Sequence, residues 1–157
     1  MNELVSQVLT NALVIVGWFI VFRQALAVRY RDDLRKIVDL AADTIDDIYQ
    51  RCCAYYSDRS SGHINHNSTN IKAKFVLLSH YLLMLREAGI DTGVSKSLTE
   101  YKIHASGGYF ETLDYQKQAE VPNWQIDLAS SAQELRYRLE RGYFDQSKRQ
   151  RKFRLLG

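Results

Sequence analysis

Proline, glycine and cysteine are scarce in this chain, and each scarcity excludes a class of protein. One proline and eight glycines among 157 residues exclude collagen-like and low-complexity chains. The two cysteines, Cys52 and Cys53, are adjacent, so they cannot form the disulfide framework of a small secreted domain. The sequence therefore indicates a globular protein, most of which lies in a reducing compartment.

An excess of charge of one sign is also lacking. Lys and Arg number 21 against 18 Asp and Glu, and the net charge of +3 excludes a polybasic or acidic disordered chain. It is also too small to argue for nucleic-acid binding by the whole chain. The charges are unevenly placed, because only Glu3 among them precedes Arg23. The average composition therefore conceals an uncharged segment near the N-terminus.

Residues 4–22 form that uncharged segment. As a helix they would extend about 28 Å, against about 30 Å for the hydrocarbon core of a bilayer. A buried core helix or a signal peptide would show a similar pattern, but a signal peptide should begin with basic residues, and none is present. We predict a transmembrane anchor over residues 1–22.

Basic residues follow this segment and none precede it. The positive-inside rule then places the N-terminus outside and the bulk of the chain in the cytoplasm, in an N-out/C-in single-pass topology. The compact size and this charge pattern suggest a bacterial inner membrane. We expect the basic residues near the anchor to contact lipid headgroups or a partner. They are Arg23, Arg29, Arg31, Arg35 and Lys36.

Small and amide side chains within the segment share one side of the expected helix. At 100° per residue they fall within an arc of about 140°. A stripe of this kind usually marks contact with another membrane helix and predicts a homo- or hetero-oligomer. The alternative is a stripe that lines a water-filled pore, but it holds no ionisable residue, which favours packing. The stripe comprises Ser6, Gln7, Thr10, Asn11 and Gly17.

Beyond the anchor, apolar spacing predicts an all-α fold, in which the transmembrane helix continues into a cytoplasmic bundle of three to four helices over residues 23–147. The first helix, about residues 23–56, carries a packing seam whose apolar residues alternate at spacings of 4 and 3. The seam comprises Leu34, Val38, Ala41, Ile45, Ile48, Cys52 and Tyr55. The opposite face carries Asp32, Asp39, Asp43 and Asp46. These aspartates could in principle hold a divalent ion, but without a histidine among them they indicate a solvated face.

Residues 57–70 are rich in Ser, Asn and Gly and are predicted to form a loop. A helix over about 71–88 is apolar on nearly all sides, which predicts a place in the middle of the bundle. A third helix, about 97–117, should start at a capping box formed by Ser97 and Glu100 and break or kink at the glycine pair 107–108. The last helix should cover about 123–144.

Four potential zinc ligands lie within 15 residues: Cys52, Cys53, His63 and His66. Zinc accepts thiolate and imidazole, but adjacent cysteines on a helix point about 100° apart and do not converge as a C-x2-4-C pair does. The sequence also shows no nucleophile elbow, phosphate-binding glycine loop or metalloprotease helix. We therefore predict neither an enzyme nor a bound cofactor.

The segment 148–157 is a basic tail in which five of the seven residues from Lys148 to Arg154 are basic. A solvated, frayed tail is the simplest interpretation. An anionic membrane would attract the tail by about 1 kcal/mol per basic residue, and nucleic-acid phosphates would attract the same residues. The anchor favours a membrane or an acidic protein over nucleic acid. The basic residues are Lys148, Arg149, Arg151, Lys152 and Arg154.

Together these patterns predict a membrane-anchored helical interaction or scaffold protein, an oligomer or complex subunit whose partners are membrane lipid and other membrane or cytoplasmic proteins. A membrane-active effector, whose oligomerised spans perturb or permeate the bilayer, is the alternative. A membrane-tethered enzyme that uses His63, His66 or the aspartate face is a third hypothesis.

Overall fold

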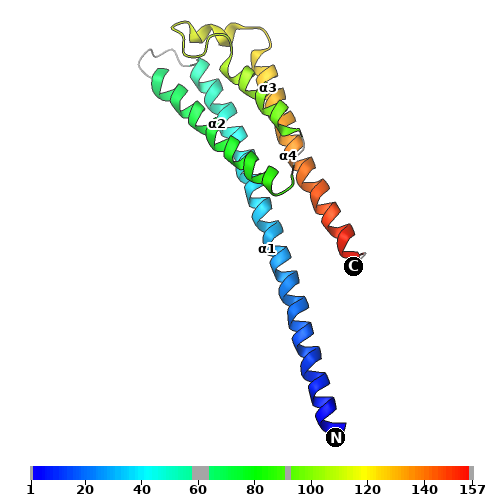
Figure 1. Cartoon of the computed structure of the whole chain (residues 1–157). Helices are drawn as coiled ribbons and strands as arrows, with labels where there is room; N and C mark the ends of the chain where they lie inside the picture. Colours follow the sequence, from blue (N-terminus) through cyan, green and yellow to red (C-terminus); the bar gives the residue numbers. More distant parts are fainter. Residues whose placement is uncertain (1, 58–63, 91–92, 156–157) are drawn as a thin grey trace. The chain divides into compact units, whose positions relative to one another are not determined.

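The computed structural model describes residues 2–57, 64–90 and 93–155, and within these ranges the chain is helical without any strand. The predicted all-α class is confirmed (Figure 1). Four α-helices and one short 3-10 helix follow one another along the chain. They are α1 (Asn2–Ser57), α2 (Ile64–Glu87), α3 (Val94–Ser106), η1 (Tyr115–Glu120) and α4 (Trp124–Leu155).

The chain divides into two compact units, Met1–Arg35 and Lys36–Gly157, and the division falls within α1. The described part of the first unit is helical throughout, as expected of a segment without proline and with one glycine, Gly17. The second unit holds the rest of α1 and the other helices. Its core is therefore built chiefly from helix faces, with Ile90 added from the connection that follows α2.

The core of the second unit contains an apolar stripe of α1 that follows the predicted seam. From Val38 to Tyr55, every residue of that seam is at most 1% exposed. Matching stripes of α2, α3 and α4 are buried with it, each with helical spacing. These stripes include Ile71, Leu78 and Leu85 of α2, Tyr101 and Ala105 of α3, and Leu128, Leu135 and Leu139 of α4.

Helix α2 differs from its prediction in two respects. It begins at Ile64, so the predicted loop over residues 57–70 is wrong for residues 64–70, which form almost two turns of helix. The predicted place in the middle of the bundle is also wrong, because the side of α2 that faces away from the core is open. Four large apolar side chains there are 36–57% exposed. These are Val76, Leu77, Leu83 and Met84.

Helix α3 begins at Val94, one turn before the predicted start at Ser97, and Gly93 occupies the N-cap position with a φ of 69°. The predicted capping box is therefore wrong. Ser97 lies inside the helix, is 1% exposed, and its hydroxyl has no hydrogen-bond partner among the described residues. The helix ends at Ser106, so the predicted interruption at the glycine pair 107–108 is confirmed. The predicted end near residue 117 is wrong, because the residues after the glycine pair do not resume an α-helix there.

Aromatic rings hold the segment between α3 and α4 against the end of α1. The Tyr55 ring lies 5.4 Å from that of Phe110 and 5.0 Å from that of Tyr115, measured between centroids. Trp124, the first residue of α4, stacks edge-on against Tyr56 and donates from Nε1 to the carbonyl of His104 at 3.0 Å. Helix α4 then runs to Leu155, eleven residues beyond its predicted end.

Candidate functional site

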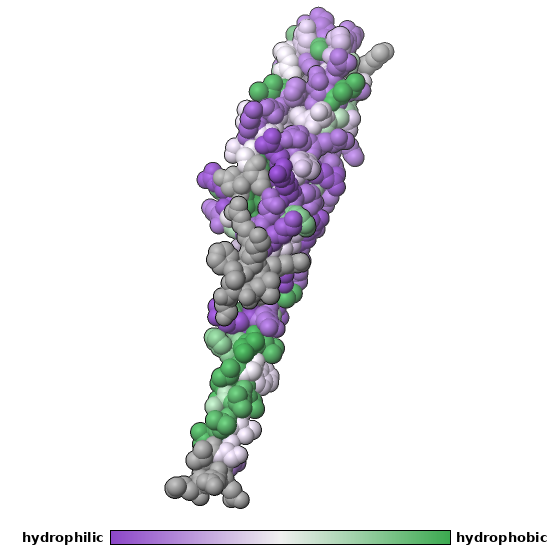
Figure 2. All heavy atoms as spheres, turned by 90° about the vertical axis from the view of Figure 1, so that its right-hand side faces the viewer, coloured by the Kyte–Doolittle hydropathy of each residue, from purple (hydrophilic) through white to green (hydrophobic). Residues whose placement is uncertain are grey.

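One described helix, α1, is long and apolar enough to cross a membrane by length and composition. None of the residues in its most apolar 18-residue stretch is buried. The large apolar side chains from Val8 to Phe22 are 51–74% exposed. Figure 2 shows hydrophobic side chains gathered on this part of α1. Within the first unit, Met1–Arg35, this helix therefore presents an apolar surface that no other described residue of that unit covers.

The predicted polar stripe lies on this exposed helix. Ser6, Gln7, Thr10, Asn11 and Gly17 are all exposed. The Thr10 hydroxyl donates to the carbonyl of Ser6 at 2.9 Å, so part of the stripe satisfies its hydrogen bonds within the helix. A Cβ at Gly17 would meet no atom within 4 Å. The stripe can therefore approach another helix closely, and its role in packing stays a prediction.

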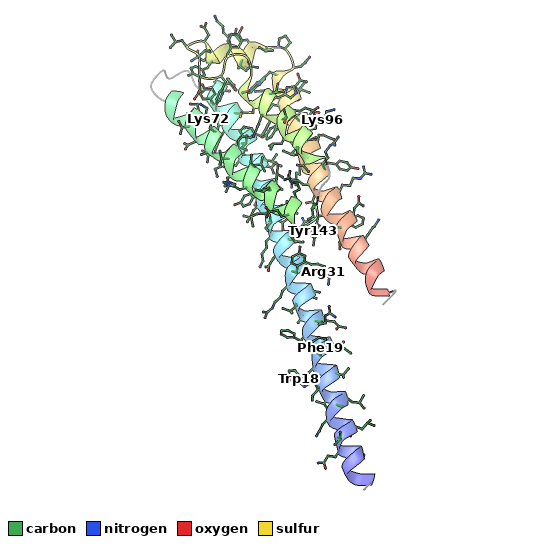
Figure 3. All side chains as sticks on the ribbon, viewed as in Figure 1. Trp18, Phe19, Arg31, Lys72, Lys96 and Tyr143 are labelled. Atoms are coloured by element: carbon green, nitrogen blue, oxygen red, sulfur yellow. The ribbon has the colours of Figure 1, made fainter. Side chains whose placement is uncertain are left out.

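Exposed apolar side chains continue along α1 past Arg23, the first basic residue. Sequence reasoning missed this continuation. Leu26, Val28 and Tyr30 are 50%, 44% and 46% exposed. The guanidinium of Arg23 lies 5.9 Å from the centroid of the Phe19 ring, one turn earlier, so its charge reaches back along the helix. Figure 3 labels Trp18, Phe19 and Arg31 along this stretch. Basic and apolar side chains thus interleave on α1 after residue 22.

The other basic residues that follow the segment occupy separate environments. Arg29 and Lys36 are exposed, whereas Arg31 and Arg35 are half-buried. Arg31 donates from Nε to the carbonyl of Ala27 at 3.3 Å. All lie on α1, but the helix spreads them around its surface.

Of the four potential zinc ligands, the structure describes the side chains of Cys52 and Cys53 only. Cys52 is buried and Cys53 is half-buried, both as free thiols. Burial raises the pKa of Cys52 to about 12 and also raises the pKa of Cys53. His63 lies outside the described residues, as does the side chain of His66. No three His, Cys, Asp or Glu side chains within the described ranges are placed to hold a metal ion.

The aspartate face of α1 is exposed, but two acidic residues on that side make contacts that the sequence did not reveal. Asp46 pairs with Arg136 of α4 at 2.8 Å, and Asp47 pairs with Lys74 of α2 at 2.8 Å. Burial tends to raise the pKa of Asp47, but hydrogen bonds from Lys74 and Arg51 outweigh it and hold that pKa below its usual value. These carboxylates therefore link helices of the second unit.

The predicted basic tail belongs to α4 as far as Leu155, so most of its backbone is helical. The ammonium group of Lys148 lies 4.4 Å from the centroid of the Phe144 ring. The side chains of Arg149, Arg151, Lys152 and Arg154 lie outside the described residues. Their contact with a membrane or a partner stays a prediction.

A groove between α2 and α3 was missed by sequence reasoning. It has a volume of about 500 Å³ and is lined mainly by apolar side chains, including Phe75, Val76 and Ile103. Lys72 and Lys102 also line it. Helices α2 and α3 contribute four lining residues each and Phe110 follows α3, so no single stretch of sequence carries the pattern. The apolar character of α2 on nearly all sides was the one signal available.

Comparisons of the chain with protein-family models, with curated proteins and with solved structures found no match.

Proposed function

We propose that this chain is a single-pass, membrane-anchored helical protein whose bundle serves as an interaction or scaffold module in an oligomer or complex. The observation that carries the proposal is the continuous apolar surface of α1. Its large apolar side chains from Val8 to Phe22 are 51–74% exposed. A patch of this extent is rare on the surface of a soluble monomer and marks contact with lipid or protein.

Bilayer dimensions favour lipid over a soluble partner. The uncharged segment of residues 4–22 is 19 residues long, close to the about 20 predominantly apolar residues that a transmembrane helix needs, and its backbone is hydrogen-bonded within the helix. A surface helix that docks on a soluble partner is usually apolar on one side only. Here the large apolar residues Trp18, Phe19 and Ile20, which are 74%, 61% and 51% exposed, point in three directions around the helix.

The charges after the span support the N-out/C-in orientation and a cytoplasmic bundle. The basic residues from Arg23 to Lys36 follow the apolar stretch, and such an excess marks the cytoplasmic side. Tyr30, 46% exposed, matches the aromatic residues that gather at a membrane interface. A bacterial inner membrane is the setting that we propose.

Extraction of membranes at alkaline pH tests the anchor. The double variant Val14→Arg with Ile15→Arg should move the chain into the soluble fraction, because each central arginine costs about 2.5–3.5 kcal/mol of insertion free energy. The matched control is Leu40→Arg with Ile126→Arg, which adds the same charge at positions 48% and 67% exposed in the second unit. Extraction of the unchanged chain as a soluble protein would refute the anchor.

A membrane-active effector is the second candidate function, and the exposed polar stripe favours it. Oligomerised spans that bring Gln7 and Asn11 together could admit water into the bilayer. Membrane depolarisation on expression, abolished by Gln7→Leu with Asn11→Leu, would support the effector over a passive anchor. Unchanged membrane potential in cells that express the full chain would exclude it.

A further inference from the structure

The groove between α2 and α3 presents an apolar surface that no described part of the chain covers. Ile71, 2% exposed, and the half-buried Phe75 are its deeper residues. Val76 on α2 and Ile103 on α3 lie at its opening and are 57% and 62% exposed. A volume of about 500 Å³ falls within the range of small-ligand sites, which are mostly apolar with a few placed polar groups.

The polar groups of the groove are chiefly two ammonium groups. The hydroxyls that line it already donate to the backbone of their own helix, Thr99 to Ser95 at 3.0 Å and Ser106 to Ile103 at 3.3 Å. Lys102 and Lys72 remain, and both are positively charged. A ligand that uses this groove should therefore carry a negative charge next to an apolar body.

The two lysines differ in whether a carboxylate already neutralises their charge. Lys72 forms an ion pair of 2.5 Å with Glu111, and its ammonium lies 5.9 Å from the centroid of the Phe110 ring. The ammonium of Lys102 lies 5.8 Å from the centroid of the Phe75 ring, and its hydrogen bond to the Ser79 hydroxyl is long, at 3.5 Å. No carboxylate pairs with Lys102 among the described residues. Lys102 is therefore the group placed to receive an anion above the apolar lining.

We propose that this groove binds a single-chain anionic amphiphile of the fatty-acid class, with its carboxylate on Lys102 and its acyl chain along Phe75, Val76 and Ile103. The size of the groove favours an acyl chain over a partner helix. A helix with its side chains is about 10 Å across and rises about 5.4 Å per turn, so the groove holds about one turn. Helix-in-groove contacts need anchors over two turns or more.

Photocrosslinking of the full chain in nanodiscs of zwitterionic lipid tests the proposal. The probe is palmitic acid with a photoreactive diazirine in its acyl chain, and labelled residues are mapped by mass spectrometry. We expect labelling in residues 71–76 and 99–110. Unlabelled palmitate should compete for this label about tenfold better than hexadecanol, which has the same chain without the charge.

Two lysines of α3 provide a matched pair of variants. Lys102→Gln should lower palmitate-competed labelling of the groove about tenfold, the effect of losing a charge-assisted hydrogen bond. Lys96→Gln removes the same charge from an 81% exposed side chain of α3 outside the groove lining, and labelling should not change. Figure 3 labels Lys96, together with Lys72 on α2. Glu111→Gln should raise labelling, because it releases Lys72.

Several outcomes would overturn the proposal. Labelling confined to residues 2–30 would mean that the probe meets the chain only through the bilayer. Equal competition by hexadecanol, or equal losses in Lys102→Gln and Lys96→Gln, would show an apolar surface without selection for the anion. Crosslinks from residues 71–76 to a second copy of the chain would show that protein covers the groove. Labelling of residues 2–30 separately reports membrane insertion, so failure of the anchor and failure of the groove are distinguishable.

Discussion

The hydroxyl of Tyr101 in α3 donates a 2.8 Å hydrogen bond to the backbone carbonyl of Ile45 in α1, 56 residues earlier. Both residues are fully buried. The tyrosine thus joins two helices through a polar contact inside an apolar core. A buried hydroxyl without a partner would be destabilising, so the contact favours one alignment of α3 against α1.

Replacement of Tyr101 by Phe should lower the free energy of unfolding by about 1 kcal/mol, the usual net value of such a hydrogen bond. Urea unfolding of the full chain in mild detergent, followed by circular dichroism, measures this change. Tyr137→Phe is the control, because Tyr137 is 57% exposed on α4. Equal stability of the two variants would show that the Tyr101 hydroxyl contributes nothing.

Buried tyrosines should also make the bundle sensitive to alkali. Burial raises the pKa of Tyr56 and of Tyr101 well above the usual value of about 10. The unfolded chain then releases protons from these tyrosines above about pH 10 that the folded chain retains, so their contribution to stability is constant below about pH 10 and is lost as the pH rises further. Unfolding free energies from pH 8 to 11 check this. Tyr101→Phe should flatten the decline, and an unchanged slope would contradict the assignment.

Gly107 should resist substitution far more than its neighbour Gly108. Its φ of 53° is left-handed, and a Cβ there would lie 2.5 Å from the Cδ of the buried Gln118 side chain. Gly107→Ala should therefore cost about 1–3 kcal/mol of unfolding free energy. A Cβ at Gly108 would meet no atom within 4 Å, so Gly108→Ala is the matched control. Urea unfolding of both variants distinguishes them, and equal effects would contradict the packing described.

Ser97→Ala should change the stability in opposite directions for a buried, unpaired serine and for a capping serine. The buried Ser97 hydroxyl has no hydrogen-bond partner in the part of the chain that the structure describes, so its removal should leave stability unchanged or raise it by up to about 1 kcal/mol. A capping serine would instead cost about 1 kcal/mol when replaced by alanine. Thermal unfolding of the unchanged chain and of Ser97→Ala decides between the two roles. A lower unfolding midpoint for Ser97→Ala would support the capping role instead.

The cysteines should react with alkylating reagents at different rates in the folded protein. A pKa of about 12 leaves Cys52 with a thiolate fraction of about 10⁻⁴ at pH 8, and its side chain is fully buried. Cys53 is half-buried and should react first, although burial raises its pKa too. Iodoacetamide labelling of Cys52→Ser and Cys53→Ser proteins, with and without urea, measures each thiol. Rapid labelling of Cys52 without urea would refute its burial.

Periodic patterns along single helices were determined by the sequence itself. The uncharged residues 4–22 and the seam from Leu34 to Tyr55 predicted helix and helical packing, because hydrophobicity and spacing are local properties. The glycine pair at 107–108 predicted an interruption for the same reason, since glycine is unfavourable within a helix. The all-α class followed from these patterns.

Only the tertiary structure decided which apolar faces are covered. Helix α2 is apolar on nearly all sides, yet helices of the bundle bury Ile71 and Leu78 while Val76 and Leu83 stay open. The pairing of Asp46 with Arg136 joins residues 90 positions apart, and the groove needs lining from two helices. Such features depend on which helices become neighbours. The sequence pattern of one helix determines which of its faces are apolar. Burial and ion pairing depend on which side chains of other helices pack against those faces.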